Sequence, residues 1–259
     1  MKAKSRRRLL ISSVAMLLVA MLALGTATFA WFTSNTTSTA DGIYAKTIKA
    51  STLKISKSNM AWTTHVAYNF GASTTGDQHV MYPASYAADG NWYNCKAAAE
   101  TAYDKATGNG DTVTPGANSD YVFKEMLNVK NDGDSGSVTN VKIAINWPTS
   151  PSAYVRLALV PCNSSGTEET NHNPSTDIYA PAADTHKQLT NASTESSNVI
   201  NAPATTQITV GNGTLAAQTA AYYNLYVWFE GQDSDCKDAN AGQTLDGLSF
   251  TVTGTPATE

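Results

Sequence analysis

Acidic side chains gather in one short segment near the carboxyl end of the chain. Glu230, Asp233, Asp235 and Asp238 lie within nine residues, directly after a hydrophobic run. Carboxylate oxygens are the ligands that Ca²⁺ takes in proteins, so these four residues form a candidate calcium site. The alternative is a solvated acidic loop. No cofactor other than Ca²⁺ is expected.

A second acidic segment, residues 132–136, reads Asp-Gly-Asp-Ser-Gly and resembles the start of a calcium-binding loop. The Glu that closes an EF-hand loop is absent from it. An ordinary turn is the favoured interpretation, because Asn, Asp and Gly tolerate the left-handed conformations that tight turns need.

The three cysteines, Cys95, Cys162 and Cys236, are odd in number, so they cannot all pair with one another. Cys162 and Cys236 each follow an expected strand, and a disulfide between them requires those two strand ends to be neighbours. Cys95 then remains on an apolar helical face. A fully reduced set is the alternative.

The sequence contains no arrangement typical of a catalytic centre. HExxH, GxSxG and P-loop spacings are absent. We therefore expect no enzymatic activity. Isolated surface histidines are favoured over a zinc site, because the four histidines are scattered through polar segments. They are His65, His79, His172 and His186.

Aromatic side chains crowd residues 59–120 among Gly, Ser and Asp. Exposed flat rings would stack on sugars, whereas buried rings would be core, since Trp and Tyr fill much of a β-sandwich interior. The candidates are Trp62, Tyr68, Trp92 and Tyr93. An exposed platform would support an alternative function, that of a cell-surface adhesin or carbohydrate-binding module.

Charge separates the first 30 residues from the rest of the chain. The whole sequence has 17 basic and 21 acidic residues, a net charge of -4. Residues 1–30 hold five of the basic residues and no acid, which leaves 12 basic against 21 acidic, or -9, for the remainder. Nucleic-acid binding depends on Lys and Arg that neutralise phosphates, so no nucleic-acid partner is expected.

Residues 1–30 have the pattern of an export signal. A basic start precedes an almost unbroken apolar segment at 9–24, and Thr28 and Ala30 fit the small-residue positions before a signal-peptidase cut that makes Trp31 the new N-terminus. Ala27, two residues after Gly25, marks a second possible site. We therefore expect a signal helix, contact with signal peptidase, and membrane contact only through this leader. An uncleaved anchor is the alternative, because the apolar run is long enough to span a bilayer.

The remainder is expected to be all-β. Residues 31–45 read as a polar arm, and residues 46–259 as one antiparallel β-sandwich with insertions at about 59–120 and 163–205. Hydrophobic alternation and apolar runs predict strands at residues 43–56, 154–160, 207–210, 221–230 and 245–253. The strand at 221–230 is apolar on both sides, which predicts a central position.

Three local predictions complete this plan. Residues 121–147 read as a hairpin whose turn is the Asn131–Gly136 segment. Residues 91–105 are rich in Ala, with apolar side chains at spacings of three to four, and predict the one short helix outside the leader. Residues 163–205 have few apolar side chains and predict a long surface loop or an insertion with little core.

Four motifs follow one another along the chain. The leader ends in Thr26-Ala-Thr-Phe-Ala-Trp-Phe-Thr33; Ser51-Thr-Leu-Lys-Ile-Ser56, Phe123-Lys-Glu-Met-Leu-Asn-Val-Lys-Asn-Asp-Gly133 and Val141-Lys-Ile-Ala-Ile-Asn-Trp147 come later. This order resembles the TasA/camelysin family of Gram-positive biofilm-matrix and surface proteins, whose precursors are cut by a dedicated signal peptidase at a junction of this type. The insertions have no counterpart in that pattern.

The resemblance implies a jelly-roll sandwich, secretion to the cell surface or matrix, and a structural role in extracellular fibres. Subunits of such fibres join by donor-strand complementation, in which the arm freed by cleavage adds as a strand to the next subunit. The expected partners are further copies of this chain and other matrix proteins. The arm residues would be Trp31 and Phe32 as anchors, with Ile43 and Tyr44. A disordered tether is the alternative.

Overall fold

The structure is a computed structural model in two units, residues 1–36 and 37–259. It describes residues 16, 37–40, 43–46, 53–57, 61–63, 68, 74–75, 78–79, 81–94, 110–134, 136–192, 194–236, 245 and 248–257. In the first unit only the helical Met16 is described. The predicted cleavage residues Thr28, Ala30 and Trp31 therefore lie outside the described residues, as does Phe32. Within the described residues, no helix has the length and apolar character needed to cross a membrane.

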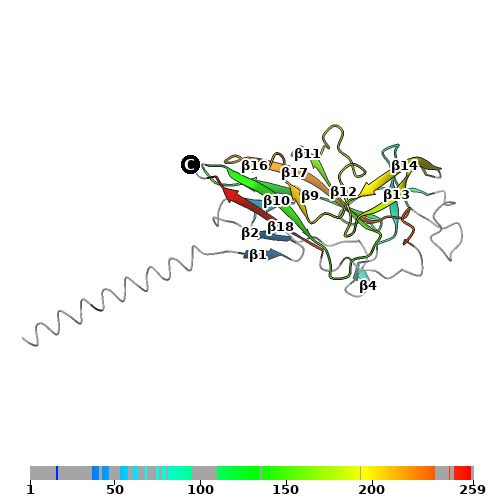
Figure 1. The fold of residues 1–259 in the computed structure, drawn as a ribbon, viewed down its shortest axis with the longest axis horizontal. Coiled ribbons are helices and arrows are strands. Elements are labelled where there is room, and N and C mark those ends of the chain that lie inside the picture. The colour runs from blue at the N-terminus through cyan, green and yellow to red at the C-terminus, as the bar shows by residue number, and fades with distance from the viewer. Residues whose placement is uncertain are drawn as a thin grey trace, which may run out of the picture. The chain divides into compact units, whose positions relative to one another are not determined.

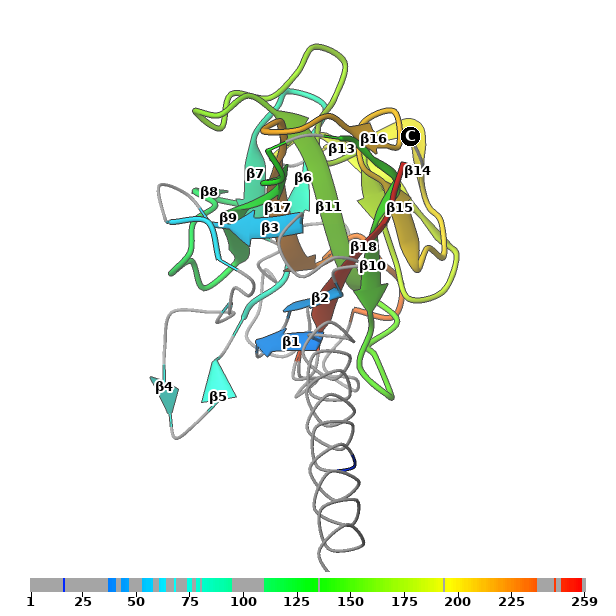
Figure 2. The ribbon, with the colours of Figure 1, turned by 90° about the vertical axis from the view of Figure 1, so that its left-hand side faces the viewer.

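The second unit consists mainly of strands in two large sheets (Figures 1 and 2). Sheet I has the order β1–β2–β18–β10–β15, and β16 also pairs with β10. Its strands are β1 (Thr37–Ala40), β2 (Ile43–Lys46), β10 (Val138–Asn146), β15 (Gln207–Thr209), β16 (Thr214–Leu215) and β18 (Ser249–Pro256). Sheet II has the order β12–β11–β17–β9–β3. Its strands are β3 (Leu53–Ser56), β9 (Val122–Asn131), β11 (Val155–Cys162), β12 (Ile178–Tyr179) and β17 (Ala220–Phe229).

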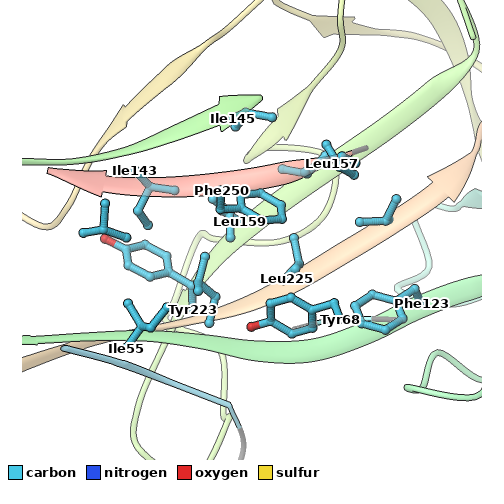
Figure 3. Packing of buried hydrophobic residues seen from close by; sticks show 14 of the residues in the cluster. Ile55, Tyr68, Phe123, Ile143, Ile145, Leu157, Leu159, Tyr223, Leu225 and Phe250 are labelled. Carbon is cyan, nitrogen blue, oxygen red and sulfur yellow. The ribbon is translucent and has the colours of Figure 1, made fainter. Parts of the chain in front are cut away.

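The main hydrophobic core contains side chains from both sheets. Sheet I contributes Ile143 and Phe250, and sheet II contributes Leu157 and Leu225. All four side chains are fully buried. Figure 3 shows these side chains meeting between the strands. The fold is therefore all-β and sandwich-like, as the hydrophobic alternation predicts.

Sheet II is covered on its other face as well. A second cluster brings Tyr226 and Trp228 of β17 against Trp92. The covering elements, called the outer layer here, are β6 (Ala84–Tyr86), β7 (Trp92–Asn94) and β8 (Thr112–Val113), together with the hairpin β13 (Asp184–Asn191) and β14 (Thr194–Ala202). β17 pairs with both β11 and β9, so the predicted central strand at 221–230 is confirmed. A separate pair, β4 (Thr74–Thr75) and β5 (Gln78–His79), completes the strands.

The predicted hairpin at 121–147 is wrong. β9 belongs to sheet II and β10 to sheet I, so the segment between them crosses the sandwich. The side-chain amide of Asn131 donates to the carbonyls of Gly136 and Leu215, and its oxygen accepts from the N–H of Gly133. These bonds stabilise a connection from sheet II to sheet I, where the sequence predicts a tight hairpin turn. The predicted strand at 43–56 likewise divides into β2 in sheet I and β3 in sheet II.

Each insertion contains strands where the sequence predicted a helix or allowed a loop. Residues 92–94 are the strand β7, because Trp92 and Tyr93 pair with β6 and β8, so the predicted helix is wrong at its start, and residues 95–105 lie outside the described residues. Residues 163–205 contain β12 and the β13–β14 hairpin where a loop was expected. Backbone pairing holds this hairpin together although few of its side chains are apolar.

Gly254 of β18 provides a test of the sandwich packing. A Cβ atom there would lie 2.5 Å from Val138 Cγ1 and 3.2 Å from Leu53 Cδ1 of the opposite sheet. Overpacking of a core costs about 1–3 kcal/mol. We expect Gly254→Ala to lower the free energy of unfolding by about that amount, measured by urea denaturation.

The matched control is Gly116→Ala, where an added Cβ would meet nothing within 4 Å. Equal stability of the two variants would contradict the close approach of β18 to β10 and β3.

Candidate functional site

The N-terminal strand pair joins sheet I in an unusual way. β2 lies parallel to β18, with Ile43 opposite Phe250, Tyr44 opposite Thr251 and Ala45 opposite Val252. β1 then pairs antiparallel with β2 and is the last described strand on that side. Among the described strands, all other ladders are antiparallel, and parallel pairing is slightly less stable per residue. The β2–β18 ladder is therefore short and of the weaker kind.

β18 is fixed independently of β2. It makes seven register pairs with β10 on its other side, and Phe250 and Val252 are fully buried in the main core. On the β2 side, residues 253–256 have no register partner among the described strands. An edge strand with open N–H and C=O groups is a template for strand addition.

The predicted assembly arm is partly built into the domain. Ile43 and Tyr44 lie in β2, and residues 37–40 form β1, so this part of the arm is paired within its own chain. A disordered tether does not describe these residues. Trp31 and Phe32, the predicted anchors, lie outside the described residues.

Two carboxylates of the acidic segment after β17, those of Glu230 and Asp233, are buried. The Glu230 carboxylate is 1% exposed and accepts hydrogen bonds from Ser85 Oγ, Trp228 Nε1 at 3.0 Å and the N–H of Gln232 at 2.9 Å. His186 Nε2 lies 3.4 Å from its second oxygen. Both carboxylate oxygens therefore have protein partners.

Asp233 takes part in a buried ion pair. Arg156 of β11 is fully buried, and its Nη2 atom donates to Asp233 Oδ2 at 2.5 Å and to Asp184 of β13. Its Nη1 atom donates to the carbonyls of Ala153 and Val155 at 2.7 and 3.0 Å. The N–H of Asp235 donates to Asp233 Oδ1 at 2.8 Å. The guanidinium therefore links sheet II, the outer layer and the loop after β17.

The two aspartates titrate differently. Burial, followed by the hydrogen bond with Asp184, raises the pKa of Asp233. Burial also acts to raise the pKa of Asp184, but its hydrogen bonds with Asp233 and the Thr185 N–H, together with Arg156, outweigh that effect and lower it. Asp233 is thus the carboxyl that keeps a proton to higher pH.

The described members of the predicted calcium site do not gather around a shared position for a metal ion. The oxygens of Glu230 and Asp233 are used by protein donors, and no group of three or more suitable side chains that could hold a metal ion occurs among the described residues. Asp235 contributes its backbone N–H to the segment, and Asp238 lies outside the described residues. The acidic segment instead anchors the outer layer to sheet II.

Sequence reasoning did not identify this buried cluster. Its members beyond the acidic segment are Ser85, Arg156, Asp184 and His186. One sequence signal could have found it: a single Arg lies inside the apolar strand Tyr154–Val160, and a fully buried Arg needs carboxylate partners. His186 is buried within the cluster, so a surface position was wrong for it. His172 is partly exposed and lies 2.9 Å from Asp177 Oδ1.

The Cys162–Cys236 disulfide is also wrong. Cys162 ends β11 opposite Tyr222, near the start of β17, whereas Cys236 follows the other end of β17, where Phe229 pairs with Val155. The antiparallel register therefore puts the two sulfurs at opposite ends of the ladder, too far apart to be bridged. Cys162 is a buried free thiol.

The aromatic candidates do not make an exposed platform. Tyr68, Trp92 and Tyr93 are buried, and Tyr68 donates to the carbonyl of Met126 at 2.6 Å. Trp62 is half-buried, with Lys130 Nζ 5.9 Å from its ring centre. These rings mainly fill the interior and the layer contacts.

Comparison of the chain with protein families, with curated protein sequences and with solved structures found no match. Its function is therefore inferred from its own residues and their geometry.

Removal of the buried cation tests the anchoring cluster. Arg156→Met would leave Asp184 and Asp233 together without their shared partner. Breaking a buried ion pair costs about 3–5 kcal/mol, and we expect a loss of that order in the free energy of unfolding, measured by chemical denaturation. Lys187→Met is the control, because Lys187 pairs with Glu195 at 3.3 Å on the surface and such pairs contribute about 0–1 kcal/mol. Similar losses in both variants would argue against the anchoring role.

The Cys162 thiol gives a pH-dependent test. Burial, followed by the Glu168 carboxylate, raises its pKa to about 11. The thiolate is the reactive form, so at pH 8 the native thiol should resist iodoacetamide and at higher pH its alkylation should accelerate. Peptide mass mapping would measure labelling at Cys162, with the urea-unfolded protein as the control. Native labelling at pH 8 as fast as in the unfolded chain would contradict this burial.

Proposed function

We propose that this protein is a secreted structural surface protein that associates with copies of itself by exchanging its N-terminal strand pair. The observation that carries the proposal is the parallel β2–β18 ladder, which completes sheet I with only three register pairs. The strand pair lies directly downstream of the predicted leader and its cleavage point.

Exchange of this strand pair follows from simple physics. If β2 leaves β18 in one subunit, the same strand of a neighbour can take its place with the same register and the same main-chain hydrogen bonds. The ladder energy then changes little, while subunits become linked. β18 keeps its position through β10 and the core during the exchange.

The finer elements of the proposal come from the resemblance to the TasA/camelysin family. They are a jelly-roll topology, removal of a leader after Ala30, Trp31 and Phe32 as anchors, and a place in a biofilm matrix or on a Gram-positive cell surface. Its proposed partners are further copies of this chain and other matrix proteins, and nucleic acid is not among them. We propose no enzymatic activity for the chain. The burial of Tyr68, Trp92 and Tyr93 favours this role over carbohydrate binding.

A proline pair in β2 tests the proposal. Successive N–H groups of a strand point to opposite edges. Prolines at both positions 44 and 45 therefore remove one N–H that points toward β18, whichever of the two residues provides it. We expect the leader-free protein with Tyr44→Pro and Ala45→Pro to fold and to stay monomeric, while the leader-free parent forms polymers. Light scattering after size-exclusion chromatography and electron microscopy would measure this.

The control is Tyr44→Ala, which keeps every backbone N–H and should still polymerise. Polymers of the double-proline variant equal to those of Tyr44→Ala, or a parent protein that stays monomeric, would refute strand exchange.

A further inference from the structure

A lysine, a carboxylate and an amide meet on the outer face of sheet II. Lys124 of β9 lies opposite Tyr226 of β17, and Asn224 is two residues before Tyr226 on the same face. Diagonal neighbours of this kind lie about 7–8 Å apart at the backbone, which a lysine side chain can span. The third member, Glu168, comes from the turn after β11, where it forms a backbone bridge with Cys162.

One carboxylate oxygen contacts both other groups. Glu168 Oε1 lies 3.6 Å from Lys124 Nζ and accepts a hydrogen bond from Asn224 Nδ2 at 3.0 Å. Nδ2 also donates to the carbonyl of Gly166 at 2.9 Å, which fixes the orientation of the amide. The amine and the amide nitrogen are thus both held against the same oxygen atom.

The surroundings favour reaction between these groups. Asn224 is 1% exposed and Tyr226 is 3% exposed, so the amide is shielded from bulk water. The Tyr226 hydroxyl donates to Glu168, and Lys124 Nζ lies 4.8 Å from the Tyr226 ring centre. Burial, followed by the hydrogen bond to Glu168, raises the pKa of Tyr226, so this hydroxyl remains a neutral donor that positions the carboxylate.

We propose that Lys124 and Asn224 form an intramolecular isopeptide bond, with Glu168 as the proton carrier. Glu168 takes a proton from the Lys124 ammonium, and the neutral Nζ attacks Asn224 Cγ. The Nζ–Cγ bond forms and the Cγ–Nδ2 bond breaks as Glu168 carries a proton to Nδ2. In total, an ammonium and a carboxamide become a secondary amide and an ammonium ion, with no oxidant or other reactant.

The cross-link would join two neighbouring strands of sheet II. It closes a chain loop of about 100 residues, and closing a loop of this length restricts the unfolded chain strongly. The bond would therefore raise the melting temperature and would resist reducing agents, unlike a disulfide. It is independent of the strand exchange proposed for β2, because it lies on sheet II and not on sheet I.

Mass spectrometry of the full chain tests the bond directly. Its formation removes one ammonia, about 17 Da, and blocks trypsin after Lys124. We expect a tryptic species in which peptide 106–130 is joined to peptide 188–237, about 17 Da lighter than the sum of the two. If the parent protein instead gives two separate peptides without the loss of about 17 Da, and trypsin cleaves after Lys124, the proposal is overturned.

Variants then assign the roles. Lys124→Arg and Asn224→Ala should abolish the joined species, and Glu168→Gln should abolish it or slow its formation at least tenfold. The matched control is Lys57→Arg, because Lys57 also contacts a glutamate, Glu125 at 3.3 Å, and should leave the joined species in place. A Glu168→Gln protein that forms the bond at the parent rate would refute the role of Glu168.

Discussion

The structure depends on the burial of β17 on both faces. Its odd-numbered side chains, such as Leu225 and Val227, lie in the core between the sheets, while Tyr226 and Trp228 lie under the outer layer. Long antiparallel ladders with β11 and β9 pair its backbone on both edges. Because one strand supports two clusters, the sandwich and the outer layer are fixed together.

Covering sheet II on both sides also places charge in the interior. Arg156 is on the outer face of β11, directly opposite Trp228 in the register, and it is fully buried. Its charge is stable there only because Asp184 and Asp233 approach from the outer layer and from the loop after β17. The acidic segment that resembled a cation site is thereby explained as an internal anchor. Sheet I, in contrast, carries at its edge the β1–β2 strand pair, which a parallel ladder of three register pairs joins to β18.

The limits of sequence reasoning follow from particular residues. Continuous apolar runs predict strands such as β17 and β11, because both of their faces are buried, and alternation elsewhere predicts the all-β class. Alternation does not tell which strands pair, so it predicts a hairpin for β9 and β10 although they lie in different sheets. The Ala-rich segment after Trp92 favoured a helix, but tertiary pairing with β6 and β8 overrides local propensity for Trp92–Asn94. The buried cluster was missed because its members are far apart in sequence.

The central claim is that β2 of one copy lies beside β18 of another. Tyr44 and Thr251 are register partners, so the most direct measurement mixes leader-free Tyr44→Cys and Thr251→Cys proteins during assembly, oxidises them and identifies linked peptides by mass spectrometry. The account predicts a disulfide between positions 44 and 251 of different chains in the polymer. The control is a single chain that carries both Tyr44→Cys and Thr251→Cys, in which the two cysteines should cross-link within the chain. If this control cross-links but polymers of the mixed single variants contain no link between positions 44 and 251, the account is contradicted.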